Sequence, residues 1–155
     1  MPQPINMEGH GGPWGKTNRD RLSRWPPMLM LLLFAVGIRA EQVTVKDGVY
    51  SAAQAERAKE LWTKSCASCH TLGTLSASTK GPALSGAEFL AKWDSKTVFA
   101  LADGIQKTMP NDFSMELTAA QATDVTALIL QANGFPAGEK ALAMGEAQKS
   151  ITIVK

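Results

Sequence analysis

Both cysteines of the chain lie in one short segment, Cys66-Ala67-Ser68-Cys69-His70. Cys-x-x-Cys followed directly by His is the attachment signature of a c-type haem. On one helical turn the two thiols face the same way, so each can add to one of the two vinyl groups on a single haem edge. His70 then lies against the face of the macrocycle, where its imidazole can ligate the iron. The motif therefore predicts one covalently bound haem c, attached through Cys66 and Cys69 with His70 as an axial ligand.

Three other interpretations of the motif are weaker. A disulfide between Cys66 and Cys69 would close a very short loop, and a thioredoxin-like redox pair needs a neighbouring βαβ pattern, which the sequence lacks. A structural zinc site needs about four nitrogen or sulfur ligands. After Ala40 only Cys66, Cys69 and His70 qualify, because the other histidine, His10, lies before that point. Haem attachment is the interpretation that the residues favour.

The first 40 residues have the pattern of an exported presequence. Four basic residues between positions 16 and 24 precede an unbroken run of eleven mostly apolar residues, 28–38, which ends near Ala40. This order predicts a secretory signal peptide that is cleaved after Ala40. The run is shorter than the roughly 20 residues that span a bilayer, so stable membrane insertion is not expected after cleavage. For a bacterial protein the mature chain would then be periplasmic.

The expected domains are the N-terminal extension with its signal peptide, residues 1–40, and one monohaem domain, residues 41–155. Five of the 16 basic and two of the 14 acidic residues lie in the extension, which leaves the mature chain with a net charge of −1. No cluster of Lys and Arg with interleaved aromatic residues follows, so nucleic acid is not an expected partner. The length of the mature chain suits a single domain.

Two capping boxes predict the longest helices. Ser51-Ala52-Ala53-Gln54 opens an Ala-rich stretch that continues to Ser65, and Thr118-Ala119-Ala120-Gln121 opens a second stretch that ends at Asn133-Gly134. In both stretches the apolar residues repeat at helical spacing. Four large side chains on the expected helices are interpreted as ordinary core: Trp62, Phe89, Phe99 and Leu128.

Shorter helices are expected between these two, at 87–93 and from Lys96 to about Lys107 with Ser95 as the N-cap. Strand-like alternation occurs only at 42–45 and 151–154, which are too short and peripheral to define a sheet. The predicted fold class is therefore all-α. Residues 139–155 are interpreted as a solvated C-terminal extension, with partner docking as the alternative.

The second axial ligand of the iron must come from outside the motif. No histidine besides His70 follows the presequence, so methionine is the natural candidate, and its soft, neutral thioether favours ferrous iron and raises the reduction potential. The mature methionines are Met109, Met115 and Met144. Met109-Pro110 follows a predicted helix in a segment that breaks regular structure, so its side chain can turn inward. Met109 is the predicted ligand, and Met115 or an open coordination position are the alternatives.

The order of these motifs resembles the class I cytochromes c. The resemblance covers residues 50 to about 135, through the haem motif, Gly81-Pro82, Met109-Pro110 and the C-terminal helix. It implies a small helical fold whose first and last helices cross around one haem with an exposed edge. It also implies that the Pro82 carbonyl accepts the Nδ1 hydrogen of His70 and so supports the axial histidine.

Two further details follow from the resemblance. Residues 129–138 are similar to the C-terminal pattern of bacterial monohaem cytochromes that accompany quinoprotein alcohol and sugar dehydrogenases. This similarity implies a redox protein partner such as a quinoprotein dehydrogenase or a terminal oxidase. Ala58 departs from the family, which usually has glycine at the helix crossing. Apart from the resemblance, Trp93 is expected either to hydrogen-bond a haem propionate or only to pack.

These features predict a soluble periplasmic one-electron carrier with His70 and Met109 as iron ligands. It would be an electron-transfer protein and not an enzyme, because no substrate bond is made or broken. One alternative is a haem subunit or docking module of a membrane-bound dehydrogenase or oxidase. A peroxidase or gas sensor is a weaker alternative, since it needs an open iron position and the sequence shows no distal His or Arg constellation.

Overall fold

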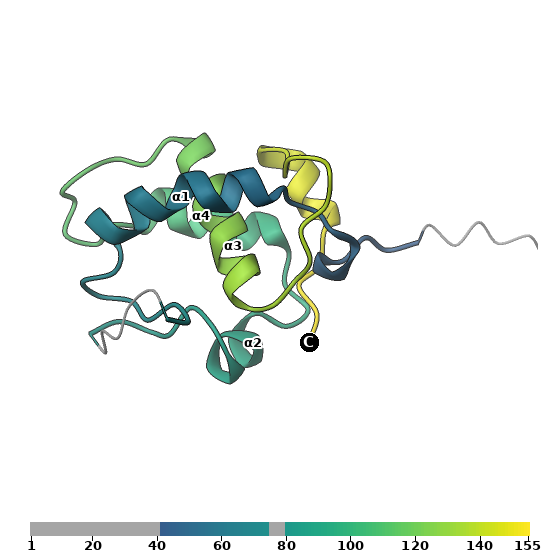
Figure 1. Cartoon of the computed structure of the whole chain (residues 1–155), viewed down its shortest axis with the longest axis horizontal. Helices are drawn as coiled ribbons and strands as arrows, with labels where there is room; N and C mark the ends of the chain where they lie inside the picture. Colours follow the sequence, from purple (N-terminus) through teal and green to yellow (C-terminus); the bar gives the residue numbers. More distant parts are fainter. Residues whose placement is uncertain (1–40, 75–79) are drawn as a thin grey trace, which may run out of the picture. The chain divides into compact units, whose positions relative to one another are not determined.

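The computed structural model describes residues 41–74 and 80–155. The elements in those ranges follow the order η1 (Val45–Asp47), α1 (Ala52–Ser65), α2 (Ala87–Trp93), α3 (Val98–Thr108), α4 (Ala119–Ala132) and η2 (Gly145–Ser150) (Figure 1). The described residues form helices and isolated bridges but no strand, which confirms the all-α class. The predicted signal peptide lies outside the described residues.

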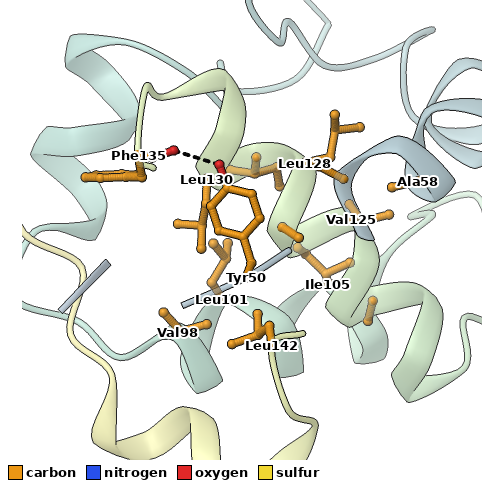
Figure 2. Close-up of a cluster of buried hydrophobic side chains, with 14 of the residues drawn as sticks. Tyr50, Ala58, Val98, Leu101, Ile105, Val125, Leu128, Leu130, Phe135 and Leu142 are labelled. Carbon is orange, nitrogen blue, oxygen red and sulfur yellow. Dashed lines mark hydrogen bonds between the residues drawn. The ribbon is translucent and has the colours of Figure 1, made fainter. Parts of the chain in front are cut away.

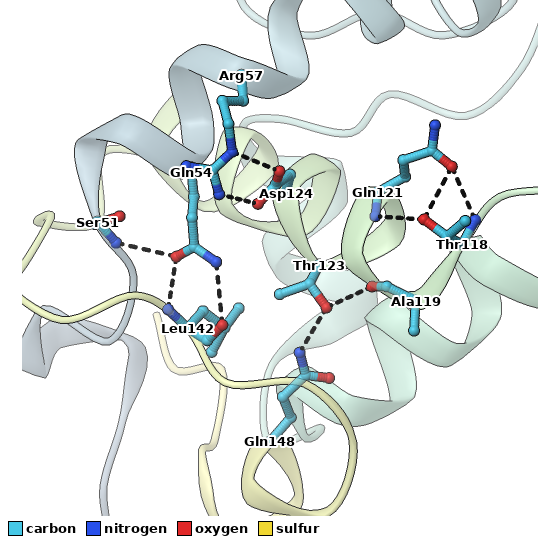
Figure 3. Close-up of polar contacts among 10 residues, drawn as sticks. All are labelled: Ser51, Gln54, Arg57, Thr118, Ala119, Gln121, Thr123, Asp124, Leu142 and Gln148. Atoms are coloured by element: carbon cyan, nitrogen blue, oxygen red, sulfur yellow. Dashed lines mark hydrogen bonds and ion pairs between the residues drawn. The ribbon is translucent and has the colours of Figure 1, made fainter.

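Helices α1 and α4 pack against each other at the centre of the fold (Figure 1). Both begin at the predicted capping boxes. The Gln54 side chain accepts the Ser51 N–H at 3.3 Å, and the Gln121 side chain accepts the Thr118 N–H at 2.9 Å (Figure 3). Each bond satisfies a backbone donor near the helix start, where intrahelical partners are missing. Both long helices predicted from the sequence are confirmed.

The contact between α1 and α4 combines buried small side chains with one ion pair at its edge. Ala58, at the position where the family resemblance implies glycine, is 1% exposed and belongs to the core. The Arg57 guanidinium donates to both carboxylate oxygens of Asp124, at 2.8 and 3.0 Å (Figure 3). Because the Arg57 side chain is 58% exposed, this pair is expected to add only about 0.2–1 kcal/mol.

Helix α2 has the predicted bounds, but the N-cap of α3 was wrongly predicted. The cap is Thr97, whose hydroxyl accepts the Ala100 N–H at 3.2 Å, and the helix runs from Val98 to Thr108. Ser95 has a φ of +64°, and its N–H donates to the carbonyl of Ile153 at 2.8 Å. Ser95 is therefore held by the C-terminal segment, and the chain turns before the helix begins.

The core is one cluster of buried apolar side chains from all four α-helices and the segments beside them (Figure 2). Three of the four side chains interpreted as core are each 1% exposed: Trp62, Phe89 and Leu128. Phe99 differs because it is only half-buried. Its ring lies 4.8 Å from the Lys149 ammonium of η2, which packs on α3, so Phe99 contacts the C-terminal segment instead of the central core.

Tyr50 forms a hydrogen bond that joins the segment before α1 to the segment after α4. Ionisation of its hydroxyl should make the free energy of unfolding depend on pH in the alkaline range. Its side chain is 1% exposed, and its hydroxyl donates to the Phe135 carbonyl at 2.6 Å (Figure 2). Burial raises the pKa of Tyr50 above its usual value of about 10. The unfolded chain then loses this proton at lower pH than the folded chain. The stability that Tyr50 contributes is present below pH 10 and declines as pH rises through the folded-state pKa.

Tyr50→Phe isolates this effect, because Tyr50 is the only tyrosine in the sequence. The variant is expected to be about 1 kcal/mol less stable at pH 7, where it lacks the hydrogen bond. The gap between wild type and variant should shrink as pH rises above 10, as measured by denaturant unfolding at a series of pH values. A gap that is constant up to pH 11 would contradict the assignment.

The C-terminal segment is not a solvated extension, contrary to the prediction from sequence. Four of its side chains are buried in the described fold: Leu142, Gln148, Ile151 and Ile153. The Gln54 side chain accepts the Leu142 N–H at 2.6 Å and donates to the Leu142 carbonyl at 3.0 Å (Figure 3). Gln148 donates to the Thr123 hydroxyl of α4 at 3.2 Å (Figure 3). These contacts make residues 139–155 part of the folded domain.

The two segments with strand-like alternation meet in a junction of isolated bridges and are not peripheral. Thr152 bridges Thr44 in parallel and Thr97 in antiparallel orientation. The Val45 N–H donates to the Thr152 carbonyl at 3.0 Å, and Val45 is fully buried. The junction thus fastens both ends of the described chain to the start of α3.

Candidate haem site

The haem motif follows directly from the end of α1. Backbone N–H groups of Cys66 and His70 donate to the carbonyls of Trp62 and Cys66, at 2.9 and 3.0 Å, so the chain continues in turns after the helix. Cys66 is half-buried, Cys69 is exposed, and both thiols are free. Burial, with a smaller effect from Cys69, raises the pKa of the Cys66 thiol to about 11.

His70 is oriented by the loop that contains Gly81 and Pro82. Its Nδ1 lies 2.9 Å from the Pro82 carbonyl oxygen, the contact that the family resemblance implies. A carbonyl only accepts hydrogen bonds, so Nδ1 carries the proton and Nε2 presents the lone pair that a metal needs. A partner of this kind fixes both the tautomer and the orientation of a metal-binding imidazole.

Gly81 is required by the space around the imidazole. Its N–H donates to the Cys69 carbonyl at 2.7 Å. A Cβ at this position would lie 2.9 Å from His70 Cε1 and 3.0 Å from His70 Nδ1. The family resemblance implied the contact between Pro82 and His70 but not the tight fit of Gly81, because close approach of a distant side chain leaves no local signal in the sequence.

Gly81→Ala is therefore expected to displace the His70 ring. Overpacking of this kind costs about 1–3 kcal/mol. The variant should unfold at lower denaturant concentration, and the proton resonances of the His70 ring should shift in the haem-loaded protein. Unchanged stability together with unchanged His70 resonances would contradict the tight fit.

Two cavities meet at His70. The Cys66 cavity has a volume of about 280 Å³ and is lined by residues that include Trp62, Cys66, Cys69, Leu117 and Val125. The Trp93 cavity has a volume of about 170 Å³ and is lined by residues that include Pro82, Lys92, Trp93, Leu101 and Gly104. Four residues line both cavities: His70, Leu84, Ile105 and Met109. Each cavity is walled mainly by apolar side chains, as is usual for cofactor sites.

The three mature methionines occupy different places. Met109 directly follows α3, where its N–H donates to the Ile105 carbonyl at 3.1 Å, and it lines both cavities together with His70. Met115 lines neither cavity, and its sulfur accepts a hydrogen bond from the Ser65 hydroxyl at 3.3 Å. Met144 is 56% exposed, on the C-terminal segment. Of the three, Met109 alone shares the cavity walls with His70.

Trp93 has two lysines beside its ring, and one of them, Lys92, lines the Trp93 cavity. The Lys92 and Lys96 ammonium groups lie 5.9 and 5.2 Å from the centre of the Trp93 ring. Phe89 stacks on the same ring at a centroid distance of 6.2 Å. The Trp93 ring therefore packs on Phe89, and Lys92 beside it brings positive charge to the cavity wall, where it suits a ligand that bears carboxylates.

The residues present fit a covalently bound haem. Two thiols and one oriented imidazole lie on adjoining turns, and apolar walls surround them. One further sign is the buried indole N–H of Trp62, for which the described residues provide no acceptor. Sequence reasoning placed Trp62 in the core only, although its position four residues before Cys66 puts it on the same helix face. In the described ranges no group of three His, Cys, Asp or Glu side chains could hold a metal ion by itself.

Comparison with known proteins points to the same class. The family model described as cytochrome C oxidase, cbb3-type, subunit III matches residues 53–129, which extend from α1 into α4 and include the haem motif and Met109. No curated protein and no solved structure matches the chain. The chain therefore contains a c-type cytochrome domain, consistent with the class I cytochromes c, which indicates an electron-transfer protein with a covalently bound haem c whose attachment motif is that of Cys66 and Cys69.

Proposed function

We propose that the protein is a periplasmic one-electron carrier whose haem iron is ligated by His70 and Met109. The observation that supports this ligation most directly is that His70 and Met109 line the same two cavities, whereas Met115 and Met144 line neither. The bound haem supplies reversible one-electron exchange at its iron. A methionine ligand in addition to histidine would raise the reduction potential of the bound haem, and burial among apolar walls would adjust it further.

The chain's own residues hold the site in a fixed geometry. The Pro82 carbonyl holds the His70 ring through Nδ1, and the end of α3 holds the backbone of Met109. Both attachments are made by protein groups alone and need no contact with the haem. An arrangement that changes little between the two states favours rapid electron transfer, because little structural reorganisation accompanies each step.

The proposed location rests on the N-terminal sequence. Positive residues followed by a short apolar run are typical of a signal peptide. Cleavage after Ala40 would release residues 41–155, which are all but the first residue of the compact unit Ala40–Lys155. In the described residues no helix has both the length and the apolar character needed to cross a membrane. We infer that the mature domain is released into the periplasm.

A terminal oxidase is the proposed electron acceptor, and a dehydrogenase, such as a quinoprotein dehydrogenase, is the proposed donor. The family match to a cbb3-type oxidase subunit supports an oxidase partner. It also favours a second candidate function, in which the domain works as a haem subunit inside an oxidase complex. The near-neutral charge of the mature chain predicts that the rate of partner binding depends only weakly on ionic strength.

The test is to express the full chain in a bacterium that has a haem-attachment system. A free carrier is expected in the periplasmic fraction, with a mass that corresponds to residues 41–155 plus one haem that resists acid-acetone extraction. It should show the far-red sulfur-to-iron absorption band and bind carbon monoxide slowly. Retention in the membrane with co-purifying oxidase subunits would favour the second candidate, and rapid carbon monoxide binding would contradict the ligation.

A further inference from the structure

Trp62 holds a buried hydrogen-bond donor that no described residue accepts. Its side chain is 1% exposed, and its Nε1 is the one buried side-chain nitrogen or oxygen in the described ranges without a partner. An indole N–H can only donate, and an unpaired buried donor is costly. Trp62 also lines the Cys66 cavity. An acceptor that arrives with the haem would remove this cost.

The protein wall of the Cys66 cavity does not provide that acceptor. Five of its residues are aliphatic: Leu84, Ile105, Leu117, Val125 and Ile129. Its polar residues include Ser65, Asn111 and Asp112, but none of them accepts the Trp62 N–H. The Asp112 side chain is exposed, and its carboxylate accepts the Ser114 N–H at 3.0 Å.

The position of Trp62 indicates which kind of acceptor atom would lie near its indole N–H in the haem-loaded protein. Trp62 precedes Cys66 by four residues, which places the two on the same helix face about one turn apart. The haem edge that joins Cys66 and Cys69 carries thioether sulfurs, whereas the haem carboxylates lie at the opposite edge. Met109, which lines the same cavity, is a second thioether. Thioether sulfur is a weak but competent acceptor.

We propose that the Trp62 indole N–H donates to a thioether sulfur in the Cys66 cavity and thereby raises the reduction potential of the haem. The sulfur belongs either to the Cys66–haem bond or to Met109, and the second source rests on the ligation proposed above. In both cases the N–H withdraws electron density from sulfur. Weaker donation to the macrocycle or to the iron stabilises the ferric state less, so the ferrous state gains.

The test uses haem-loaded Trp62→Phe, which keeps an aromatic ring and deletes the N–H. The equilibrium constant for reduction is expected to fall about threefold to tenfold, and a tenfold fall corresponds to 59 mV for one electron. If Met109 is the acceptor, the far-red sulfur-to-iron band shifts as well. If the Cys66 thioether is the acceptor, the potential falls while that band stays in place. Absence of the band from the wild type would instead refute Met109 ligation and leave the Cys66 source standing.

Ultraviolet resonance Raman spectroscopy gives a readout that does not depend on redox behaviour. The mature chain has two tryptophans, Trp62 and Trp93, so the difference between wild type and Trp62→Phe isolates the Trp62 indole. The expected spectrum is that of a hydrogen-bonded indole. A spectrum typical of a free N–H, or a reduction potential unchanged in Trp62→Phe, would overturn the proposal.

Leu128→Ala is the control for loss of packing. Leu128 is 1% exposed in the same core and lines neither cavity. This variant is expected to be less stable than Trp62→Phe but to keep the wild-type potential within about twofold in the reduction constant. A fall in potential equal to that of Trp62→Phe would attribute the effect to packing and overturn the proposal.

Discussion

Met109→Ala is expected to abolish the far-red sulfur-to-iron band and to open the haem iron to carbon monoxide. The equilibrium constant for reduction should fall by more than about tenfold, a decrease of more than about 59 mV, because the ligand that favours ferrous iron is lost. The covalent haem should remain bound, since Cys66 and Cys69 are untouched. Absorption spectra, a redox titration and carbon monoxide binding measure these three properties on one sample.

Met115→Ala is the matched control for this prediction. Met115 is only six residues away, but its sulfur is held by the Ser65 hydroxyl and it lines neither cavity. The control is expected to keep the band and to lose only the stability of a partly buried side chain. If Met115→Ala loses the band and Met109→Ala keeps it, the assignment of the axial ligand is reversed.

Removal of residues 139–155 is expected to unfold the domain at room temperature. The truncation deletes three buried aliphatic side chains, Leu142, Ile151 and Ile153, each of which stabilises the fold by about 1.5–3 kcal/mol. It also leaves the amide of Gln54 without its two bonds to Leu142. The combined loss is comparable with the whole stability of a small domain, about 5–15 kcal/mol. Circular dichroism and denaturant unfolding of the haem-loaded protein measure it.

Single substitutions show whether this effect comes from packing. Ile153 is fully buried, so Ile153→Ala is expected to cost about 2–5 kcal/mol. Val43 lies in the same junction but is 42% exposed, so Val43→Ala should cost less than about 0.5 kcal/mol. If the truncated protein keeps wild-type stability, the C-terminal segment contacts the domain but does not contribute to its free energy of unfolding.

Local patterns were enough to predict the helices and the haem motif. The capping boxes at Ser51 and Thr118 have a reciprocal bonding pattern that few other conformations satisfy, so the bounds of α1 and α4 followed from sequence. Cys66, Cys69 and His70 are close in sequence, so their proximity in space was assured. The approach of Pro82 to His70 came from the family resemblance, because nothing local links residues twelve apart.

The errors occurred where distant segments decide the structure. Ser95 and Thr97 are both good N-caps locally, and the hydrogen bond from Ser95 to Ile153 decides between them. The apolar residues within 139–155 do not repeat at helical spacing, so the burial of this segment depends on its pairing with Gln54, Thr123 and Thr44. Likewise, the unpaired N–H of Trp62 is visible only when every nearby acceptor is known.

The junction at Thr152 brings the beginning and the end of the described domain to one corner. Thr44 bridges Thr152, and the Lys46 ammonium donates to the carbonyl of Lys155. No residue of either terminal segment, 41–50 or 136–155, lines the Cys66 or Trp93 cavity. Chain ends that lie this close are well suited to circular permutation and to fusion. A short linker joining Lys155 to Glu41 would close the polypeptide into a ring, and a second domain fused at either end would leave the haem face accessible.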